Sequence, residues 1–192
     1  MKKVVFCIQN QQIEEILLKN KIINQKSILI RNKGDLTIDF LDKHKPDYVM
    51  FPHWSYKVPL EIINAYKCIC FHSSPLPYGR GGSPLQNMIK RGHQTTEVCS
   101  LLMEEQFDTG PIFLRSEVSL KGSLHEILER VYEAVSDQME FLIRQDIIPK
   151  KQKGEPTIFK RLGPSDNLID FKISRIASAP IPAVKDSSPY SS

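Results

Sequence analysis

Short apolar runs alternate with amphipathic stretches along the first half of the chain. The runs predict buried strands, and the stretches, in which apolar residues recur every three or four positions, predict helices. Strands are expected at Val4–Ile8, Ser27–Ile30, Tyr48–Phe51 and Cys68–His72, and helices at Gln11–Lys19, Leu36–His44 and Pro59–Ala65. This rhythm predicts an α/β fold of the Rossmann-like, doubly wound type, with a mostly parallel sheet covered by helices on both faces.

The second half of the chain is less regular. A turn-rich segment, Ser73–Gly82, leads into a helix with Ser83 as its N-cap and Pro84 as its first residue. The remaining regular structure is expected as the strands Glu97–Met103 and Ile112–Val118 and the helix Ser123–Arg144. That last helix has the longest apolar stripe and opens with a capping box, so it is the most strongly indicated element.

Composition divides the chain into three regions. Residues 1–148 contain the alternating pattern, and we expect them to form the main domain. Residues 149–176 are expected to form a C-terminal extension, whose first part, Lys151–Arg161, is interpreted as a small hairpin or an extended arm. Residues 177–192 are rich in proline and serine, which predicts a poorly ordered tail.

The charge and the cysteines narrow the class of protein. Hydrophobic residues make up 41% of the chain, which is ordinary for a globular protein. The formal net charge is only +4, and the lysines and arginines are scattered along the sequence, which argues against a nucleic-acid partner. No apolar stretch is long enough for a signal peptide or a membrane helix. The four cysteines lie in apolar segments and are expected to be free thiols. We therefore expect a cytoplasmic protein that does not contact a membrane.

His72 and Asp108 are the first candidates for chemistry. His72 is expected at the carboxyl end of a parallel strand, where ligands bind in sheets of this type, and Asp108 lies in the polar loop 104–110. Strand alternation places Cys68 and Cys70 on the same face as His72, which leaves open a metal site or a Cys70 nucleophile. The sequence has no second Cys/His pair with suitable spacing, so we expect no metal and a buried thiol at Cys70.

Two motifs resemble those of the folate-dependent formyltransferase family. The first runs from His72 to Pro84 and reads HSSPLPYGRGGSP, similar to the family's histidine followed by Ser-x-Leu-Pro-x-x-Arg-Gly. The second, Phe107-Asp108-Thr109-Gly110, resembles its Asp-x-Gly loop. The similarity extends from about residue 1 to 145, which implies that residues 1–148 are a formyltransferase catalytic domain.

The resemblance implies roles for particular residues. His72 would be the catalytic histidine and Asp108 its partner, with 10-formyltetrahydrofolate as the formyl donor and no metal. The donor is expected to contact Trp54, Lys57, Val58, Met103, Glu105, Gln106 and Phe107. The acceptor is expected to contact Tyr78, Arg80, Gly81 and Gly82. Two alternatives remain, since Arg80 could brace its loop through a salt bridge and Trp54 could pack in the core.

One residue departs from the family's pattern. The asparagine that stands two positions before the histidine, and helps to hold the formyl oxygen as it becomes an oxyanion, is replaced by Cys70. Losing such a donor costs about 3–4 kcal/mol in the barrier. His72, Asn87 or a main-chain N–H group could substitute for it. The alternative is a formyltransferase-like module that binds folate or a nucleotide without turnover.

The acceptor implied by the resemblance is the amine of a sugar nucleotide. Residues 9–12 lack the glycine-rich phosphate loop of glycinamide ribonucleotide formyltransferases, and the chain lacks the basic insertion and C-terminal barrel of methionyl-tRNA formyltransferases. The run Tyr78–Asn87 resembles enzymes that formylate a UDP-4-amino sugar in pathways of the pseudaminic acid type. We therefore expect a small-molecule acceptor and no nucleic acid, while a homodimer stays open. A methionyl-tRNA formyltransferase-like enzyme is the alternative.

Overall fold

The computed structural model describes residues 1–163 and 166, and every structural statement below concerns these residues. The elements in chain order are β1 (Val4–Ile8), α1 (Gln11–Lys19), α2 (Lys21–Lys26), β2 (Ser27–Ile30), the 3-10 turn η1 (Lys33–Asp35), α3 (Ile38–His44), β3 (Tyr48–His53), α4 (Leu60–Ala65), β4 (Cys68–His72), β5 (Arg80–Gly81), α5 (Pro84–Lys90), β6 (Thr95–Leu102), β7 (Ile112–Ser119), α6 (Leu124–Arg144) and β8 (Ile158–Phe159). The tail predicted for residues 177–192 lies outside the described residues.

A six-stranded sheet with the order β2-β1-β3-β4-β6-β7 forms the centre of the molecule. β1 pairs in parallel with β2 and β3, and β3 pairs in parallel with β4. β6 is antiparallel to both of its neighbours, β4 and β7, so it alone of the six strands runs in the opposite direction. The prediction of a Rossmann-like, mostly parallel sheet is confirmed.

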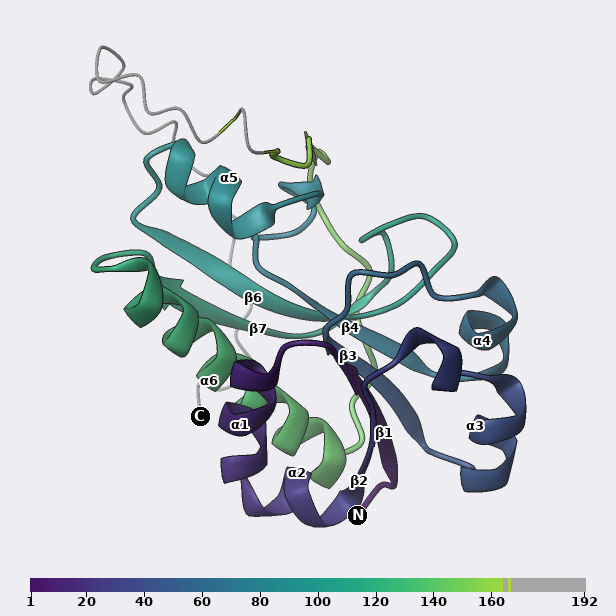
Figure 1. Cartoon of the computed structure of the whole chain (residues 1–192). Helices are drawn as coiled ribbons and strands as arrows, with labels where there is room; N and C mark the ends of the chain where they lie inside the picture. The colour runs from purple at the N-terminus through teal and green to yellow at the C-terminus, as the bar shows by residue number, and fades with distance from the viewer. Residues whose placement is uncertain (164–165, 167–192) are drawn as a thin grey trace, which may run out of the picture.

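Helices cover both faces of this sheet (Figure 1). Alternate residues of β1 point to opposite faces, so Phe6 packs with α1, α2 and α6, whereas Val5 packs with α3 and α4. β1 is buried along its whole length, as a strand covered on both sides must be. Because helices cover both faces of the sheet, a ligand can reach it only at the ends of its strands. We therefore look for a site at the carboxyl ends of the parallel strands and in the loops that follow them.

The local differences from the sequence prediction have simple causes. α2 was not predicted, because it has only one fully buried side chain, Ile23, and so shows no apolar stripe. The helix expected from Leu36 begins at Ile38, since the Thr37 side chain accepts a hydrogen bond from the Phe40 N–H and caps it there. α6 begins with the predicted capping box of Ser123 and Glu126.

Ser83 precedes α5 but does not cap it through its side chain. Its backbone is left-handed, with φ 49°, and its hydroxyl accepts a hydrogen bond from the N–H of Leu162 at 3.1 Å. A residue in that conformation cannot aim its hydroxyl at the first turn of the helix as an extended N-cap does. Ser83 is the N-cap residue and Pro84 the first residue of α5, as predicted, but the side-chain hydrogen bond typical of a serine N-cap is absent.

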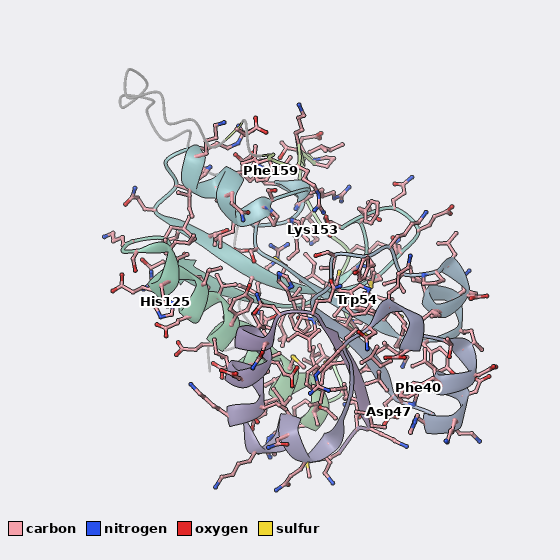
Figure 2. All side chains as sticks on the ribbon, viewed as in Figure 1. Phe40, Asp47, Trp54, His125, Lys153 and Phe159 are labelled. Atoms are coloured by element: carbon pink, nitrogen blue, oxygen red, sulfur yellow. The ribbon has the colours of Figure 1, made fainter. Side chains whose placement is uncertain are left out.

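The segment 151–161 forms an extended arm and no hairpin of its own. Within it, β8 pairs in parallel with β5, so Ile158 and Phe159 lie beside Arg80 and Gly81. Phe159 is buried, and Figure 2 shows it among the side chains near α5. The arm thereby covers the glycine-rich loop that follows His72. Among the described residues, no helix is both long enough and apolar enough to cross a membrane.

Candidate active site

His72 and Asp108 meet at the carboxyl end of β4. Pairing of β4 with β3 and β6 places His72 where the strand leaves the sheet, and Asp108 comes from the loop between β6 and β7. Nδ1 of His72 lies 3.4 Å from Oδ1 of Asp108, and the two side chains are only 7% and 14% exposed. An imidazole and a carboxylate this close and this shielded from water form an ion pair when the ring takes up a proton.

The second ring nitrogen of His72 is already committed. Nε2 lies 2.8 Å from the carbonyl oxygen of Gly79, and the Ser74 hydroxyl donates to the same oxygen at 3.0 Å. A carbonyl only accepts, so Nε2 carries the hydrogen in this contact. Nδ1 is then the nitrogen that is free to take a proton, and as an imidazolium it would donate to Asp108.

Asp108 is held in an uncommon backbone conformation. Its φ is 57°, in the left-handed region that costs most residues free energy, although aspartate tolerates it better than most. Its Oδ2 accepts a hydrogen bond from the N–H of Gly81 at 2.8 Å, while its Oδ1 faces His72. The next turn requires glycine, because a Cβ on Gly110 would lie 1.8 Å from the carbonyl oxygen of Leu102.

The glycine-rich loop is fixed by the C-terminal arm. The Gly79 N–H donates to the hydroxyl of Thr157 at 2.7 Å, and the Gly82 N–H donates to the carbonyl of Phe159 at 3.0 Å. A Cβ on Gly81 would lie 2.7 Å from that same carbonyl oxygen. The glycines thus let two backbones approach closely. The acceptor contacts predicted for Gly81 and Gly82 remain predictions.

A cavity of about 430 Å³, counted out to its open mouth, lies beside the His72–Asp108 pair. Its walls are Lys57, Val58, Leu60, Ile63, Cys70, Leu101, Leu102, Met103, Glu104, Glu105, Gln106, Phe107 and Asp108. Six of the seven residues predicted to contact the donor therefore share one cavity. The seventh, Trp54, is not part of its wall and instead packs edge-on against Phe51 and Tyr56, at centroid distances of 6.2 and 5.5 Å.

Cys70 is a neutral thiol in the wall of this cavity. Burial raises its pKa well above the usual value, and the nearby Asp108 carboxylate raises the pKa further. A thiol that holds its proton so firmly is not an activated nucleophile, which argues against that alternative. All four cysteines are free, and burial raises the pKa values of Cys68 and Cys99 to about 12. The described residues contain no group of three or more histidine, cysteine or acidic side chains placed to hold a metal ion.

Asn87 cannot replace the asparagine that Cys70 displaces. Its side-chain amide donates to the carbonyl oxygens of Gly82, Ser83 and Lys160 at 3.2, 3.0 and 3.1 Å. These contacts use both of its hydrogens in the anchoring of α5 to the arm. Of the substitutes considered from the sequence, His72 and main-chain N–H groups remain.

Tyr78 and Arg80, both predicted to contact the acceptor, have different surroundings. The Tyr78 hydroxyl lies 3.3 Å from Nε2 of His93, and its ring packs against Phe159. Arg80 donates from Nε and Nη2 to the side-chain oxygen of Gln152 at 3.2 and 2.7 Å. This partner is neutral, so the loop is braced by a hydrogen bond where the sequence suggested a salt bridge. Gln152 was not predicted, because a single glutamine in a lysine-rich segment carries no sequence signal.

The amino-acid sequence matches a known protein family and a curated relative. Residues 10–145 match the family described as formyl transferase. The methionyl-tRNA formyltransferase of Clostridium perfringens is 30% identical over 155 residues, which cover 77% of this chain and 50% of that protein. The chain thus spans about half the length of this curated relative.

Two solved structures resemble the fold. The methionyl-tRNA formyltransferase from Clostridium thermocellum has a TM-score of 0.82 and 32% identity, over 90% of this chain and 79% of that one. The formyltransferase PseJ from Anoxybacillus kamchatkensis, solved with UDP-4,6-dideoxy-4-formamido-L-AltNAc and tetrahydrofolate, has a TM-score of 0.62 and 19% identity, over 82% of this chain and 85% of that one. At that identity, the second likeness is one of fold alone.

Proposed function

This chain belongs to the formyl transferase family, and on that premise we propose that it transfers a formyl group from 10-formyltetrahydrofolate to a primary amine. The observation that carries the proposal is the His72–Asp108 pair beside a largely apolar cavity, whose wall includes Asp108. A proton-accepting group beside a site for a flat, partly apolar donor is what formyl transfer to an amine requires.

The donor would occupy the cavity between α4 and the loop 103–108. Val58, Ile63 and Leu101 offer apolar surface to a ring system, and the loop offers main-chain polar groups at its edge. PseJ, which shares the fold, was solved with tetrahydrofolate, and this supports a folate donor here. Lys57 and the exposed Phe107 stand at the rim, where they would contact the outer part of the donor.

The proton chemistry would run through Nδ1 of His72. When the acceptor amine attacks the formyl carbon, its nitrogen becomes positively charged and must lose a proton, and the folate nitrogen that leaves must gain one. Nδ1 can accept the first proton because Nε2 stays bonded to Gly79. The Asp108 carboxylate would stabilise the resulting imidazolium and hold the ring in place. With Cys70 a weak donor and Asn87 committed, the imidazolium would stabilise the oxyanion through its positive charge and not through a hydrogen bond, because its two N–H groups face Gly79 and Asp108.

The proposed acceptor is the amine of an amino-sugar nucleotide. The support is the run Tyr78–Asn87, together with an Arg80 guanidinium whose positive charge is not compensated by a carboxylate among the described residues and could therefore bind a phosphate. PseJ carries a UDP-linked formamido sugar on the same fold, which is consistent with this acceptor but does not distinguish it from others.

Methionyl-tRNA is a second candidate with comparable support. Two relatives at 30% and 32% identity are methionyl-tRNA formyltransferases, so the exclusion of nucleic acid is not supported. Residues 150–163, which include the arm, contain five lysines and arginines and only one acidic residue, Glu155. Such a basic segment would suit a polyanion. The argument from a missing C-terminal barrel has no weight, since the chain spans only half of such relatives.

The decisive assay supplies the purified chain with 10-formyltetrahydrofolate and, in separate reactions, a UDP-4-amino sugar or methionyl-tRNA. Release of tetrahydrofolate and a formylated product by mass define turnover. We expect turnover with the amino-sugar nucleotide and a rate lower by about 10²-fold or more for His72→Ala. Turnover with methionyl-tRNA alone would establish the second candidate. Folate binding without turnover of either acceptor would identify a non-catalytic module and overturn the proposal.

A further inference from the structure

The carboxamide of Gln152 joins two loops of the candidate site. Its Nε2 donates to the carbonyl oxygens of Asp108 and Gly110 at 2.8 and 2.9 Å. Its Oε1 accepts from Nε and Nη2 of Arg80 at 3.2 and 2.7 Å. A single half-buried side chain from the C-terminal arm thus holds the loop of Asp108 and the loop of Arg80 at the same time.

We propose that Gln152 is a positioning residue that sets the direction of the Asp108 carboxylate, and that the arm is thereby a working part of the site. For its effect on catalysis the inference rests on the proposed function, but the geometry stands independently of it. Gln152 lies beyond the boundary expected at residue 148. We therefore place residues 150–163 with the catalytic domain.

The backbone of Asp108 explains why its carbonyl needs a partner. A φ of 57° is sparsely populated by residues other than glycine, and it persists where the surroundings hold it. The bond from Gln152 fixes the carbonyl of Asp108, and the second bond to Gly110 fixes the plane of the turn that follows. If both bonds are lost, the turn can relax to an ordinary conformation. The carboxylate would then move away from Nδ1 of His72 and from the Gly81 N–H.

The hydrogen-bonding partners around position 152 require an amide side chain. The two carbonyls require a donor, and Arg80 requires an acceptor, so a side chain must supply both at one end. Glutamate would keep the contact with Arg80 but would lose the donor and place a second negative charge near Asp108. Leucine has nearly the same size and would lose every hydrogen bond. Gln152→Glu and Gln152→Leu therefore separate the Arg80 contact from the contacts to the Asp108 loop.

The first test measures kcat and KM for 10-formyltetrahydrofolate with the acceptor that turns over. We expect kcat to fall by about 10- to 100-fold in both variants, since a displacement of about 1 Å at a reacting group can cost that much. The KM for the donor should stay within about threefold, because Gln152 makes no hydrogen bond to the residues of the cavity wall other than Asp108. The matched control is Glu155→Leu, an exposed position on the same arm, which should keep the wild-type kcat. A kcat above half of wild type in Gln152→Leu would overturn the inference.

The second test does not depend on turnover. Hydrogen–deuterium exchange should become at least tenfold faster in the peptide that covers residues 79–82, because the Gly81 N–H loses its aligned partner on Asp108. Glu155→Leu should exchange like the wild type. Unchanged exchange in both Gln152 variants would overturn the inference even if their rates fell. A wild-type chain without activity would instead refute the proposed function, and the exchange data would still decide the role of Gln152.

Discussion

At the scale of single residues, the site depends on a carboxylate with two different partners. Oδ1 of Asp108 faces Nδ1 of His72, and Oδ2 accepts from the Gly81 N–H. Only the charged carboxylate suits an imidazolium and a main-chain donor together. Backbone groups of the neighbouring loop thereby fix the orientation of both side chains, as the proposed proton transfer would require.

Asp108→Asn should lower kcat by about 10²-fold while donor binding is retained. The asparagine oxygen would keep the bond from Gly81, so its NH₂ group would face Nδ1 of His72 and favour an unprotonated nitrogen there. The imidazolium would lose its partner, although the cavity would keep its shape. Stopped-flow rates and a fluorescence titration with tetrahydrofolate measure the two quantities. The proposed role fails if kcat is kept, or if donor affinity is lost to the same extent as the rate.

Cys70→Asn should raise kcat about tenfold or more, because it restores an amide donor at the wall of the cavity beside Asp108. Cys70→Ala is the matched control, and it should leave kcat within about twofold, since the neutral thiol is a weak donor. Both variants are compared in the assay for tetrahydrofolate release. An unchanged rate in Cys70→Asn would mean that another group already holds the formyl oxygen.

At the scale of elements, the two-stranded pairing of β5 with β8 decides whether the arm stays on the site. The close approach is possible because Gly82 has no side chain, and a Cβ there would lie 2.5 Å from Cα of Arg161. Besides the bonds between the paired strand residues themselves, three main-chain bonds join the loop and the arm: two from Arg80 and Gly82 to the arm, and one from Thr157 to Pro77. Short pairings of this kind depend on every contact, since two-residue strands have little else to stabilise them.

Gly82→Ala should lower the free energy of unfolding by about 1–3 kcal/mol, the usual cost of inserting a methyl group into a filled space. Gly34→Ala is the matched control, because an added Cβ at that position meets nothing within 4 Å. It should change the free energy by less than about 0.5 kcal/mol. Urea denaturation gives both values. A Gly82→Ala protein as stable as the control would show that the arm does not pack on the loop in solution.

At the scale of the whole molecule, stability should fall as the solution becomes acidic. Burial lowers the pKa of His53 and of His93 below the usual value of 6.5, and the nearby Arg91 lowers the pKa of His93 further. The folded state therefore favours the neutral rings. Their contribution is complete above pH 6.5 and is lost as the pH falls through the lowered folded-state values, because the unfolded chain binds those protons first.

Urea denaturation between pH 8 and pH 5 tests this dependence. The free energy of unfolding should decline below about pH 6.5, the usual histidine value. His53→Gln and His93→Gln together should flatten the decline, with His93→Gln alone removing part of it. A decline of the same slope in the double variant would assign the effect to carboxylates. A flat profile in the wild type would contradict the prediction directly.

The sequence by itself determined the parts that depend on short-range order. Apolar runs and three–four spacing placed the strands of the sheet and the long helix α6, because each pattern records which face an element buries. The sequence also predicted that His72 lies at the end of a strand and that Asp108 lies in an acidic loop, since both follow from local pattern and motif. The short helix α2 was missed because it buries one side chain.

Tertiary structure alone decided how these parts act on one another. The left-handed backbone of Asp108, the commitment of Asn87 to three carbonyls and the bridge made by Gln152 all depend on partners far away in the chain. The same is true of β6, whose antiparallel direction sets the loop of Asp108 against His72. Hydrogen-bond partners and backbone strain are properties of the packed molecule, because a residue's own sequence neighbours do not specify which distant donor or acceptor it will meet.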